Sequence, residues 1–248
     1  MYTEHSPHPA LMSYVETYWS TNGFVEYEKK SRILPDGCVD ILFFLYDTKQ
    51  GGLKPCCPHI IGTMTTFSEI AYLGVVKVVG IRFRPGGITA FTRVPVNEFT
   101  DMRIELNSVE SVFDNSFCAD ISGDMSINDL ISYVDNYLLE RLPRLFVPDE
   151  RIWYAISLFR HEKGNIPVSV VASKACLSGR QFERRFLSEI GISPKAFSRI
   201  TKFQSTYNFL KLKPKQSLFE TAVDCGYYDH AHLIKEFKRL SGDSPSRF

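Results

Sequence analysis

The chain has 248 residues, of which 44% are hydrophobic, 23% charged and 13% aromatic. This composition is typical of a globular protein with a sizeable core, and it excludes a disordered or fibrous chain. No apolar run approaches the roughly 18 residues that a membrane helix needs. The N-terminus has neither the basic nor the apolar region of a secretory signal, so we expect a cytoplasmic protein with no membrane partner.

The charges are unevenly distributed along the chain. Residues 1–148 contain 12 Lys and Arg against 18 Asp and Glu, a net charge of −6, whereas residues 149–248 contain 17 against 10, a net charge of +7. Such asymmetry indicates two domains, of which the basic one suits a polyanion. We place a β-rich regulatory domain at 1–142, a linker at 143–148 and a helical domain at 149–248. Charge alone leaves open whether the basic surface meets nucleic acid or only solvent.

The first half reads mainly as strands with flanking helices. Residues 32–46 predict a turn and a buried strand, and residues 75–83 predict a second, β-branched strand. Gly and Pro recur between such runs, and this spacing indicates a sandwich or barrel. Residues 10–19 and 127–141 have the apolar spacing of helices. The apolar stripe of the second helix either contacts another copy in a homodimer or packs against its own domain.

After Pro148 the pattern is helical throughout. A first helix opens at Asp149, where acidic side chains suit the helix dipole, and ends at Gly164. Further helices are predicted at 168–175, 178–190, 193–212, 217–225, 228–240 and 244–248. The predicted fold class is therefore α+β, with a β-rich first domain and an all-α second domain.

The helical half contains an internal repeat. Six positions match at a constant offset of 51 residues, and each unit reads as helix, turn, helix, Gly stop and a Ser-Pro start of the next helix. Each unit is therefore a predicted helix-turn-helix. The matched residues are Phe182, Phe186, Gly191, Ser193, Pro194 and Phe197 in the first unit and Leu233, Phe237, Gly242, Ser244, Pro245 and Phe248 in the second.

The second helix of each unit has a distinct outward face. At about 100° per residue, Phe182 and Phe186 face the core, while Arg180 and Arg184 point to the opposite side with Glu183 beside them. Such a helix fits the major groove, where Arg can bond the O6 and N7 of guanine and Glu can accept from cytosine N4. Solvated charges on a helical bundle are the alternative, and the duplication together with the +7 charge favours DNA.

These residues resemble the DNA-binding domain of AraC/XylS-type transcription regulators. The resemblance rests on residues 177–186 and 227–248 and covers roughly residues 150–248. It implies seven helices in two subdomains joined by the long helix 193–212, with both second helices in successive major grooves. By position it assigns base readout to Arg180, Glu183 and Arg184 in the first unit and to Ala231, His232 and Lys235 in the second. Ala231 and Ile234 are apolar where many members carry polar side chains, so we expect most base specificity from the first unit.

The first half resembles the N-terminal domain of a bacterial subset of these regulators. The resemblance rests on residues 9–19, 32–40, 80–87 and 95–98 and implies a β-rich, cupin-like sensing domain. We expect an internal pocket lined by aromatic side chains, and a two-state mechanism in which a small molecule or partner alters how the basic domain meets promoter DNA. RNA polymerase is a further expected partner if the protein is an activator.

A cupin-like enzyme, or an interaction protein fused to a helical module, is the alternative function. Metal sites of the cupin kind need two or three His and a Glu, and residues 1–148 have only His5, His8 and His59. A site made of Cys56, Cys57 and His59 is weakened because adjacent cysteines chelate one ion poorly. The six cysteines form no C-x-x-C motif, so we expect free thiols. We predict no catalytic residue, no metal and no cofactor.

Overall fold

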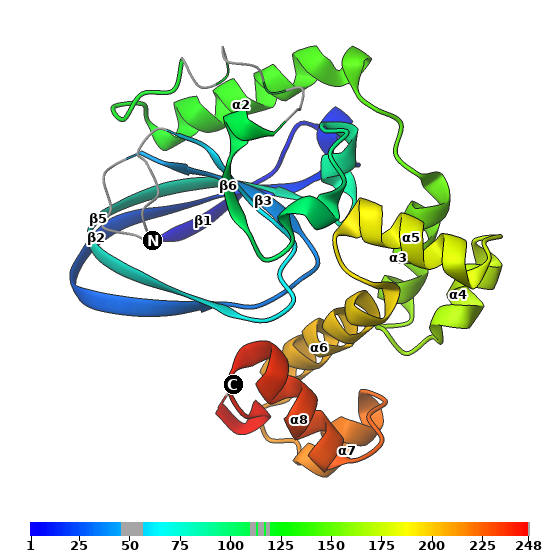
Figure 1. Ribbon diagram of the computed structural model, residues 1–248. Helices are drawn as coiled ribbons and strands as arrows, with labels where there is room; N and C mark the ends of the chain where they lie inside the picture. The colour runs from blue at the N-terminus through cyan, green and yellow to red at the C-terminus, as the bar shows by residue number, and fades with distance from the viewer. Residues whose placement is uncertain (46–56, 110–112, 114–116, 118–119, 248) are drawn as a thin grey trace.

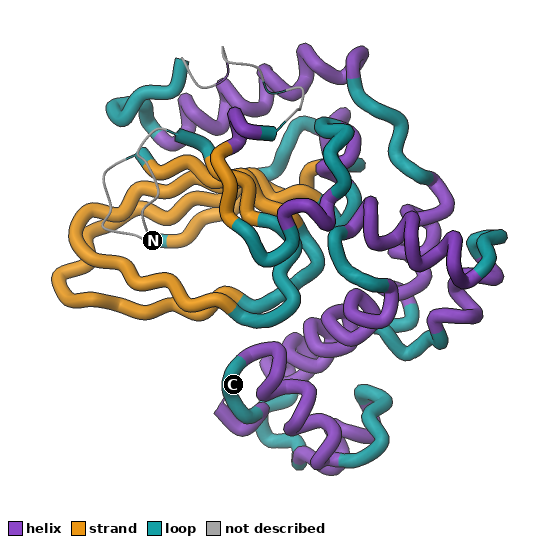
Figure 2. The backbone as a smooth tube through the Cα atoms, in the orientation of Figure 1, coloured by secondary structure: helices purple, strands orange, loops and turns teal. Residues whose placement is uncertain are grey.

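The computed structural model describes residues 1–45, 57–109, 113, 117 and 120–247. Strands fill the first half of the chain and helices fill the second, as Figures 1 and 2 show. The α+β prediction is confirmed. Below, the N-terminal part means the described residues up to 148, and the C-terminal part means those from 149 onward.

The N-terminal part is built on one six-stranded antiparallel sheet with the order β1-β2-β5-β3-β4-β6. Its two longest strands, β2 and β5, pair along almost their whole lengths and form an arm that curves away from the shorter strands (Figure 1). In the described residues the strands therefore form one curved sheet rather than the two sheets of a sandwich. The strands are β1 Tyr2–His5, β2 Val15–Ile33, β3 Val39–Phe44, β4 His59–Ile61, β5 Ser68–Phe83 and β6 Arg103–Glu105.

The helix expected at residues 10–19 is wrong. Only the short 3₁₀ turn η1, Pro9–Leu11, is helical, and β2 begins at Val15. Leu11, Val15 and Tyr18 are buried at a spacing that imitates a helix face. Tyr18 instead pairs with Ile81 of β5, because a β-branched and aromatic run gains more from this long-range ladder than from a local helix.

Helix α2, Ile127–Arg141, has the predicted bounds and lies across one face of the sheet (Figure 1). Its apolar stripe of Leu130, Val134, Tyr137 and Leu138 is buried in the same core as the strands. Of the two alternatives for this stripe, packing against its own domain is the one observed. Short 3₁₀ turns complete this part: η2 Gly87–Ala90, η3 Val96–Phe99, η4 Leu106–Ser108 and η5 Leu142–Arg144.

The C-terminal part has a hydrophobic core of its own, built from Ile152 through Leu240. Six α-helices and a final 3₁₀ turn make up the seven expected helices. They are α3 Glu150–His161, α4 Val168–Lys174, α5 Gly179–Ile190, α6 Pro194–Leu212, α7 Leu218–Asp224, α8 His230–Ser241 and η6 Pro245–Arg247. Phe248, the last residue of the predicted repeat, lies outside the described residues. A search of the described residues finds no helix with the length and apolar character to cross a membrane.

Candidate nucleic-acid interface

The repeat forms two helix-turn-helix units, α4–α5 and α7–α8, joined by the long helix α6 (Figure 1). Local signals fix both second helices. Ser178 caps α5 in a reciprocal capping box with Gln181, and the Asp229 side chain caps α8 by accepting from the His232 backbone N–H. Both helices end at a glycine in the left-handed conformation, Gly191 and Gly242.

The outward face of α5 matches the sequence prediction. Phe182 and Phe186 are fully buried, while Arg180, Glu183 and Arg184 are exposed. Among the described residues, neither Arg180 nor Arg184 forms an ion pair. The neighbouring Arg185 is different, because it bonds the Asp149 carboxylate at 2.9 Å. In the described part of the chain, the side chains of the two predicted readout arginines therefore have no ion-pair partner and are exposed.

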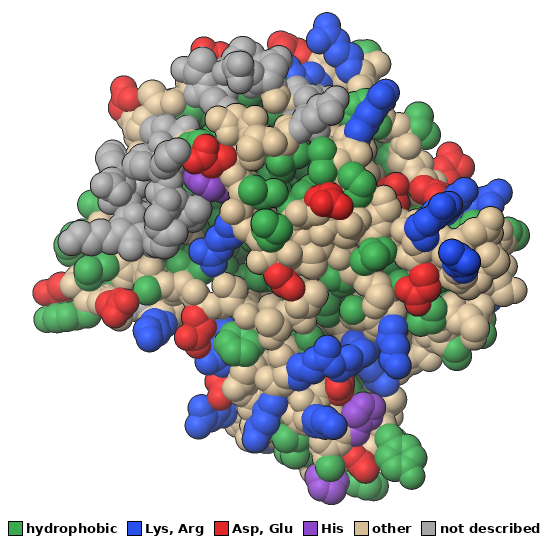
Figure 3. All heavy atoms as spheres, viewed as in Figure 1, with side chains coloured by type: hydrophobic (Ala, Val, Ile, Leu, Met, Phe, Trp, Pro, Cys, Tyr) green, Lys and Arg blue, Asp and Glu red, His purple; other side chains and the backbone are tan. Residues whose placement is uncertain are grey.

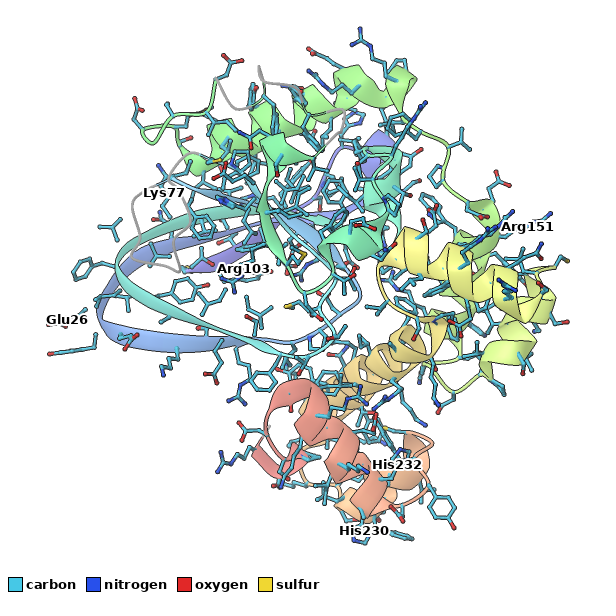
Figure 4. The ribbon with its side chains drawn as sticks, in the orientation of Figure 1. Glu26, Lys77, Arg103, Arg151, His230 and His232 are labelled. Carbon is cyan, nitrogen blue, oxygen red and sulfur yellow. The ribbon has the colours of Figure 1, made fainter. Side chains whose placement is uncertain are left out.

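The outward face of α8 is less charged. Ala231, His232 and Lys235 are exposed, and Leu233 and Phe237 are fully buried. The His232 ring meets the Tyr227 ring edge-to-face, with 5.5 Å between centroids. Figure 4 labels His230 and His232 on this helix, on the outer side of the second unit.

A bidentate ion pair joins the second unit to the connecting helix. The Arg199 guanidinium of α6 donates two hydrogen bonds of 2.6 Å to the Glu236 carboxylate of α8. Such fork-to-fork pairing fixes orientation as well as distance. Lys and Arg side chains gather over the C-terminal helices on the face shown in Figure 3.

The C-terminal ends of both second helices are docked onto the N-terminal part. The Thr63 hydroxyl donates to the Ile190 carbonyl at 2.7 Å, and the Thr100 hydroxyl donates to the Gly191 carbonyl at 2.6 Å. At the equivalent end of α8, the Thr66 hydroxyl donates to the Arg239 carbonyl at 2.9 Å. The last carbonyls of a helix have no partner within the helix, so these hydroxyls satisfy acceptors that would otherwise need water.

Arg32 adds a cation to the docking of α8. It donates to the Ser241 carbonyl at 2.8 Å and pairs with the carboxylates of Asp243 at 2.5 Å and Glu69 at 2.9 Å. A positive charge beside a helix C-terminus is favourable because it opposes the helix dipole. Hydrogen bonding from Arg32 also lowers the pKa of Asp243.

The two capping glycines are required by this close approach. A Cβ on Gly191 would lie 2.7 Å from the Thr100 Oγ1, and a Cβ on Gly242 would lie 2.6 Å from the Phe67 ring. Both glycines have positive φ, 85° and 78°, which other residues rarely adopt. The repeat therefore carries the same docking point twice, once at the end of each second helix.

Three of the docking residues come from one loop. Residues 62–67, between β4 and β5, form what we call the docking segment; Thr63 contacts the first unit, and Thr66 and Phe67 contact the second. Asp101 holds this segment from behind, because its carboxylate accepts from the backbone N–H and the hydroxyl of Thr65 at 2.7 and 2.6 Å. One braced loop thus touches both helix-turn-helix units.

The docking segment also lines a cavity of about 830 Å³ in the N-terminal part. Gly62, Met64, Thr66 and Phe67 supply one wall, and strands β2, β3 and β5 supply others. The aromatic-lined pocket expected from the sequence is therefore present. Its aromatic lining is Tyr2, Trp19, Phe24, Phe44, Phe67 and Tyr72.

Two arginines reach this apolar cavity. Arg82 forms a two-point ion pair with Asp40, at 3.1 and 3.0 Å. Burial raises the pKa of Asp40 above its ordinary value, although Arg82 opposes that shift. Arg103 of β6 donates to the Ser68 hydroxyl at 3.1 Å and has no carboxylate partner among the described residues. Figure 4 labels Arg103 in the space enclosed by the strands.

Comparison with known proteins separates the two parts of the chain. Residues 3–105 match a family model described as a domain of unknown function, DUF6597, and residues 171–248 match one described as a helix-turn-helix domain. An uncharacterized HTH-type transcriptional regulator of Haemophilus influenzae is 29% identical over 116 residues, 46% of this chain and 39% of that protein. The HTH-type transcriptional regulator MtrA of Neisseria gonorrhoeae is 34% identical over 87 residues, 35% of this chain and 28% of that protein. The chain thus spans less than half the length of these curated relatives.

Among solved structures, ToxT of Vibrio cholerae has a similar fold over 93% of this chain and 97% of its own, with a TM-score of 0.52 at 8% identity. Such low identity shows the fold alone. The two units, their spacing and the family-model match define residues 171–248 as a helix-turn-helix domain. The chain is similar in sequence to HTH-type transcriptional regulators over at most 46% of its length, and it is similar in fold to ToxT over 93% of its length.

Sequence reasoning missed the docking residues. Thr63, Thr66 and Thr100 are ordinary threonines in sequence, and nothing local marks them as partners of helix ends far along the chain. Arg32 and Gly37 lie in a block whose sequence predicts a turn and resembles the N-terminal domain of related regulators, and neither signal predicts a contact with the C-terminal part. A Cβ on Gly37 would lie 2.7 Å from the Phe197 ring of α6, so this block also meets the C-terminal part.

Proposed function

We propose that the protein is a sequence-specific transcription regulator that binds promoter DNA with α5 and α8. The observation that carries this proposal is the double docking. Both second helices are held by their C-terminal ends, while the outward faces of their N-terminal halves, with Arg180 and Arg184 on α5 and Ala231 and His232 on α8, are exposed. In helix-turn-helix proteins it is the N-terminal residues of the second helix that contact bases.

On this proposal Arg180, Glu183 and Arg184 read bases in one major groove. Arg can bond guanine through two acceptors, which specifies a base as well as binding it. The neighbouring groove receives Ala231, His232 and Lys235. There the Ala231 methyl group can contact the methyl group of thymine, and Lys235 can reach phosphate. The proposed domain organisation is the one described above, with a sensing domain at 1–142, a linker at 143–148 and a DNA-binding domain at 149–248.

Selection of binding sites from a randomised duplex pool by the full-length protein tests this function. We expect one enriched motif with two parts about one helical turn apart, because the two helices occupy successive grooves. Affinity for that motif should fall steeply with salt, since phosphate contacts release counterions. Enrichment of no motif, or an affinity that salt does not change, would contradict the proposal.

We further propose that the N-terminal part senses a small apolar acid and does not transform it. A cavity of about 830 Å³ is of the size that binds small molecules. Its lining is largely apolar, and Arg103 offers a cation without a carboxylate partner in the described part. A structure of ToxT, similar in fold with a TM-score of 0.50, is bound to (E)-4-(8-methylnaphthalen-1-yl)but-3-enoic acid, which is itself an apolar acid.

Oleic acid and oleyl alcohol form a matched pair of probes for this cavity. We expect oleate to bind the full-length protein by calorimetry and the alcohol to bind at least about tenfold more weakly, since a hydrogen bond to a charged group contributes ~1.5–3 kcal/mol. Arg103→Gln should remove that difference, and Arg93→Gln, which lies outside the cavity, should keep it. Equal binding of acid and alcohol would show that Arg103 does not select a carboxylate.

The docking segment is the proposed route from ligand to DNA. Because residues 62–67 line the cavity and contact both helix-turn-helix units, a ligand that shifts this loop changes how α5 and α8 are held. Couplings of this kind are typically ~1–3 kcal/mol, a change of roughly 5- to 150-fold in affinity. Promoter binding implies a cytoplasmic location, and an activating role would make RNA polymerase a further partner.

A further inference from the structure

A cluster of three metal-binding residue types lies at the edge of the sheet, outside the cavity and the helices. Cys57, His59 and Glu105 each offer one ligand atom, and these atoms lie within 4.8 Å of one another. His59 is buried, and the other two side chains are partly buried. No metal site is expected from the sequence, because sequence spacing does not show that Glu105 lies beside Cys57 and His59.

The sheet register brings two of these side chains together. His59 of β4 and Glu105 of β6 are direct partners in the antiparallel ladder. Directly opposed residues have their Cβ atoms about 4.5–5.5 Å apart on the same face. The ladder continues past this pair, since the Leu106 N–H donates to the Pro58 carbonyl at 2.8 Å. The backbone, rather than chance side-chain rotation, therefore sets this juxtaposition.

The orientation of His59 suits a metal ligand. Its Nδ1 lies 2.8 Å from the Cys57 carbonyl oxygen, so Nδ1–H donates there and leaves the lone pair on Nε2. Metal-ligating histidines usually fix their tautomer by such a bond from the other ring nitrogen. The Phe44 ring, with its centroid 6.4 Å away, packs against the imidazole and restricts its rotation.

The donor set matches zinc. One thiolate, one imidazole and one carboxylate are all accepted ligands of Zn²⁺, and three protein ligands leave a fourth position open. The thiolate and carboxylate together balance the charge of a divalent ion. We propose that Cys57, His59 and Glu105 bind one Zn²⁺ ion.

Such an ion would join the edge strand β6 to its neighbour β4 at one end. Ile61 and Arg103, at the other end of the same strands, are also ladder partners and both line the cavity. Metal binding would thus stabilise the strand pair that presents Arg103 to the cavity. This proposal does not depend on the DNA-binding function, and either can fail alone.

Cobalt titration of the reduced, metal-free full-length protein tests the proposal. Co²⁺ is spectroscopically visible where Zn²⁺ is silent, and a Co²⁺–thiolate bond gives a near-ultraviolet charge-transfer band. We expect this band to saturate at one Co²⁺ per chain, together with visible bands of four-coordinate cobalt, and to disappear when Zn²⁺ is added. Absence of a thiolate band at saturating Co²⁺ would overturn the proposal.

Variants identify the ligands. Cys57→Ser should abolish the charge-transfer band, and Glu105→Gln, a near-isosteric change, should keep the band but weaken Co²⁺ binding at least about tenfold. Cys176→Ser changes a distant exposed thiol and should leave the titration unaltered. Near-ultraviolet circular dichroism of each metal-free variant checks that it is folded. Cobalt binding that survives Cys57→Ser, or that Cys56→Ser abolishes instead, would place the thiolate elsewhere and refute this site.

Discussion

The two helix-turn-helix units are alike where they meet the rest of the protein and different where they face outward. Each second helix ends at a left-handed glycine packed against the N-terminal part, and each receives a threonine hydroxyl on a terminal carbonyl. Outward, α5 presents the exposed Arg180 and Arg184, whereas α8 presents Ala231, His232 and Lys235. The repeat has thus kept its attachment points and diverged on the surface proposed to read DNA.

The turns of the two units differ by one residue. Buried Val171 and Ala172 of α4 correspond to Thr221 and Ala222 of α7 at an offset of 50, while the second helices match at 51. The extra residue falls in the second turn, where Tyr228 is 93% exposed beside the start of α8. An insertion there lengthens the turn before α8 without disturbing the buried positions.

The largest expected contrast is in base readout. Arg184→Ala should relax base preference under the first unit by ~1–3 kcal/mol, because a bidentate arginine–guanine contact discriminates among bases. Lys235→Ala should weaken binding to all sequences alike. It should also reduce the slope of log affinity against log salt concentration by about one. Site selection with both variants measures this. If Arg184→Ala leaves the selected motif unchanged and Lys235→Ala erases part of it, the assignment of base specificity to the first unit is wrong.

Glycine substitutions address the docking points. Gly191→Ala and Gly242→Ala should each lower the free energy of unfolding by ~1–2 kcal/mol, because alanine is strained at positive φ. The close contact of the new Cβ with Thr100 or Phe67 should add to this loss. Denaturant unfolding measures the loss. Gly74→Ala is the matched control, since Gly74 also has a positive φ, 79°, and its Cβ would meet nothing within 4 Å. A loss for Gly74→Ala as large as the other two would show that the docking contacts contribute nothing.

Removing single threonine hydroxyls tests the docking of the two helix-turn-helix units one at a time. Thr63→Val should destabilise the protein by ~1 kcal/mol, more than Thr66→Val. Thr63 is fully buried, so its loss leaves the Ile190 carbonyl with neither this hydroxyl nor water as a hydrogen-bond donor. Hydrogen exchange should increase at the end of α5 in the first variant and at the end of α8 in the second. Equal responses of both helices to either variant would mean that they are released together.

The two turns offer a smaller test. Cys176 has a φ of 55° in the first turn, where the second turn uses Gly226. Cys176→Gly should raise stability by ~0.5–1 kcal/mol, since glycine adopts this conformation without steric cost. Cys176→Ser is the control, because it removes the thiol and keeps the strain. A gain in thermal unfolding temperature for both variants would attribute the effect to the thiol.

Acid should loosen one unit selectively, with the smallest effect. Arg32 lowers the pKa of Asp243, so the stabilisation from their ion pair is present above the ordinary Asp pKa and is lost as pH falls through the lowered value. The end of α5 accepts from the neutral hydroxyls of Thr63 and Thr100, and burial there raises the pKa of Glu189, so protonation of this carboxyl in acid does not weaken the end of α5. Hydrogen exchange at decreasing pH, corrected for intrinsic rates, should show α8 opening first, and Asp243→Asn should abolish the difference.

The helical half was largely predictable because its signals are local. Ser178 and the two capping glycines mark helix ends within a few residues, and the repeat supports them. The predicted start of α8 at residue 228 is two residues early, because Asp229 is the cap. The first half was less predictable because its contacts are remote. The run ending at Trp19 imitates a helix until Gly80, its partner across the ladder, is known. The docking threonines and the His59–Glu105 pair depend on register and on packing between distant segments, which no local pattern encodes.

The position of the docking segment has a consequence for thermodynamic linkage. If one loop carries the coupling, the factor by which a cavity ligand changes DNA affinity must equal the factor by which DNA changes ligand affinity. A short duplex would then act as an effector of the cavity, although it touches only the far ends of α5 and α8. The occupancy of the sensing site would depend on how much promoter DNA is available, as well as on the concentration of the ligand.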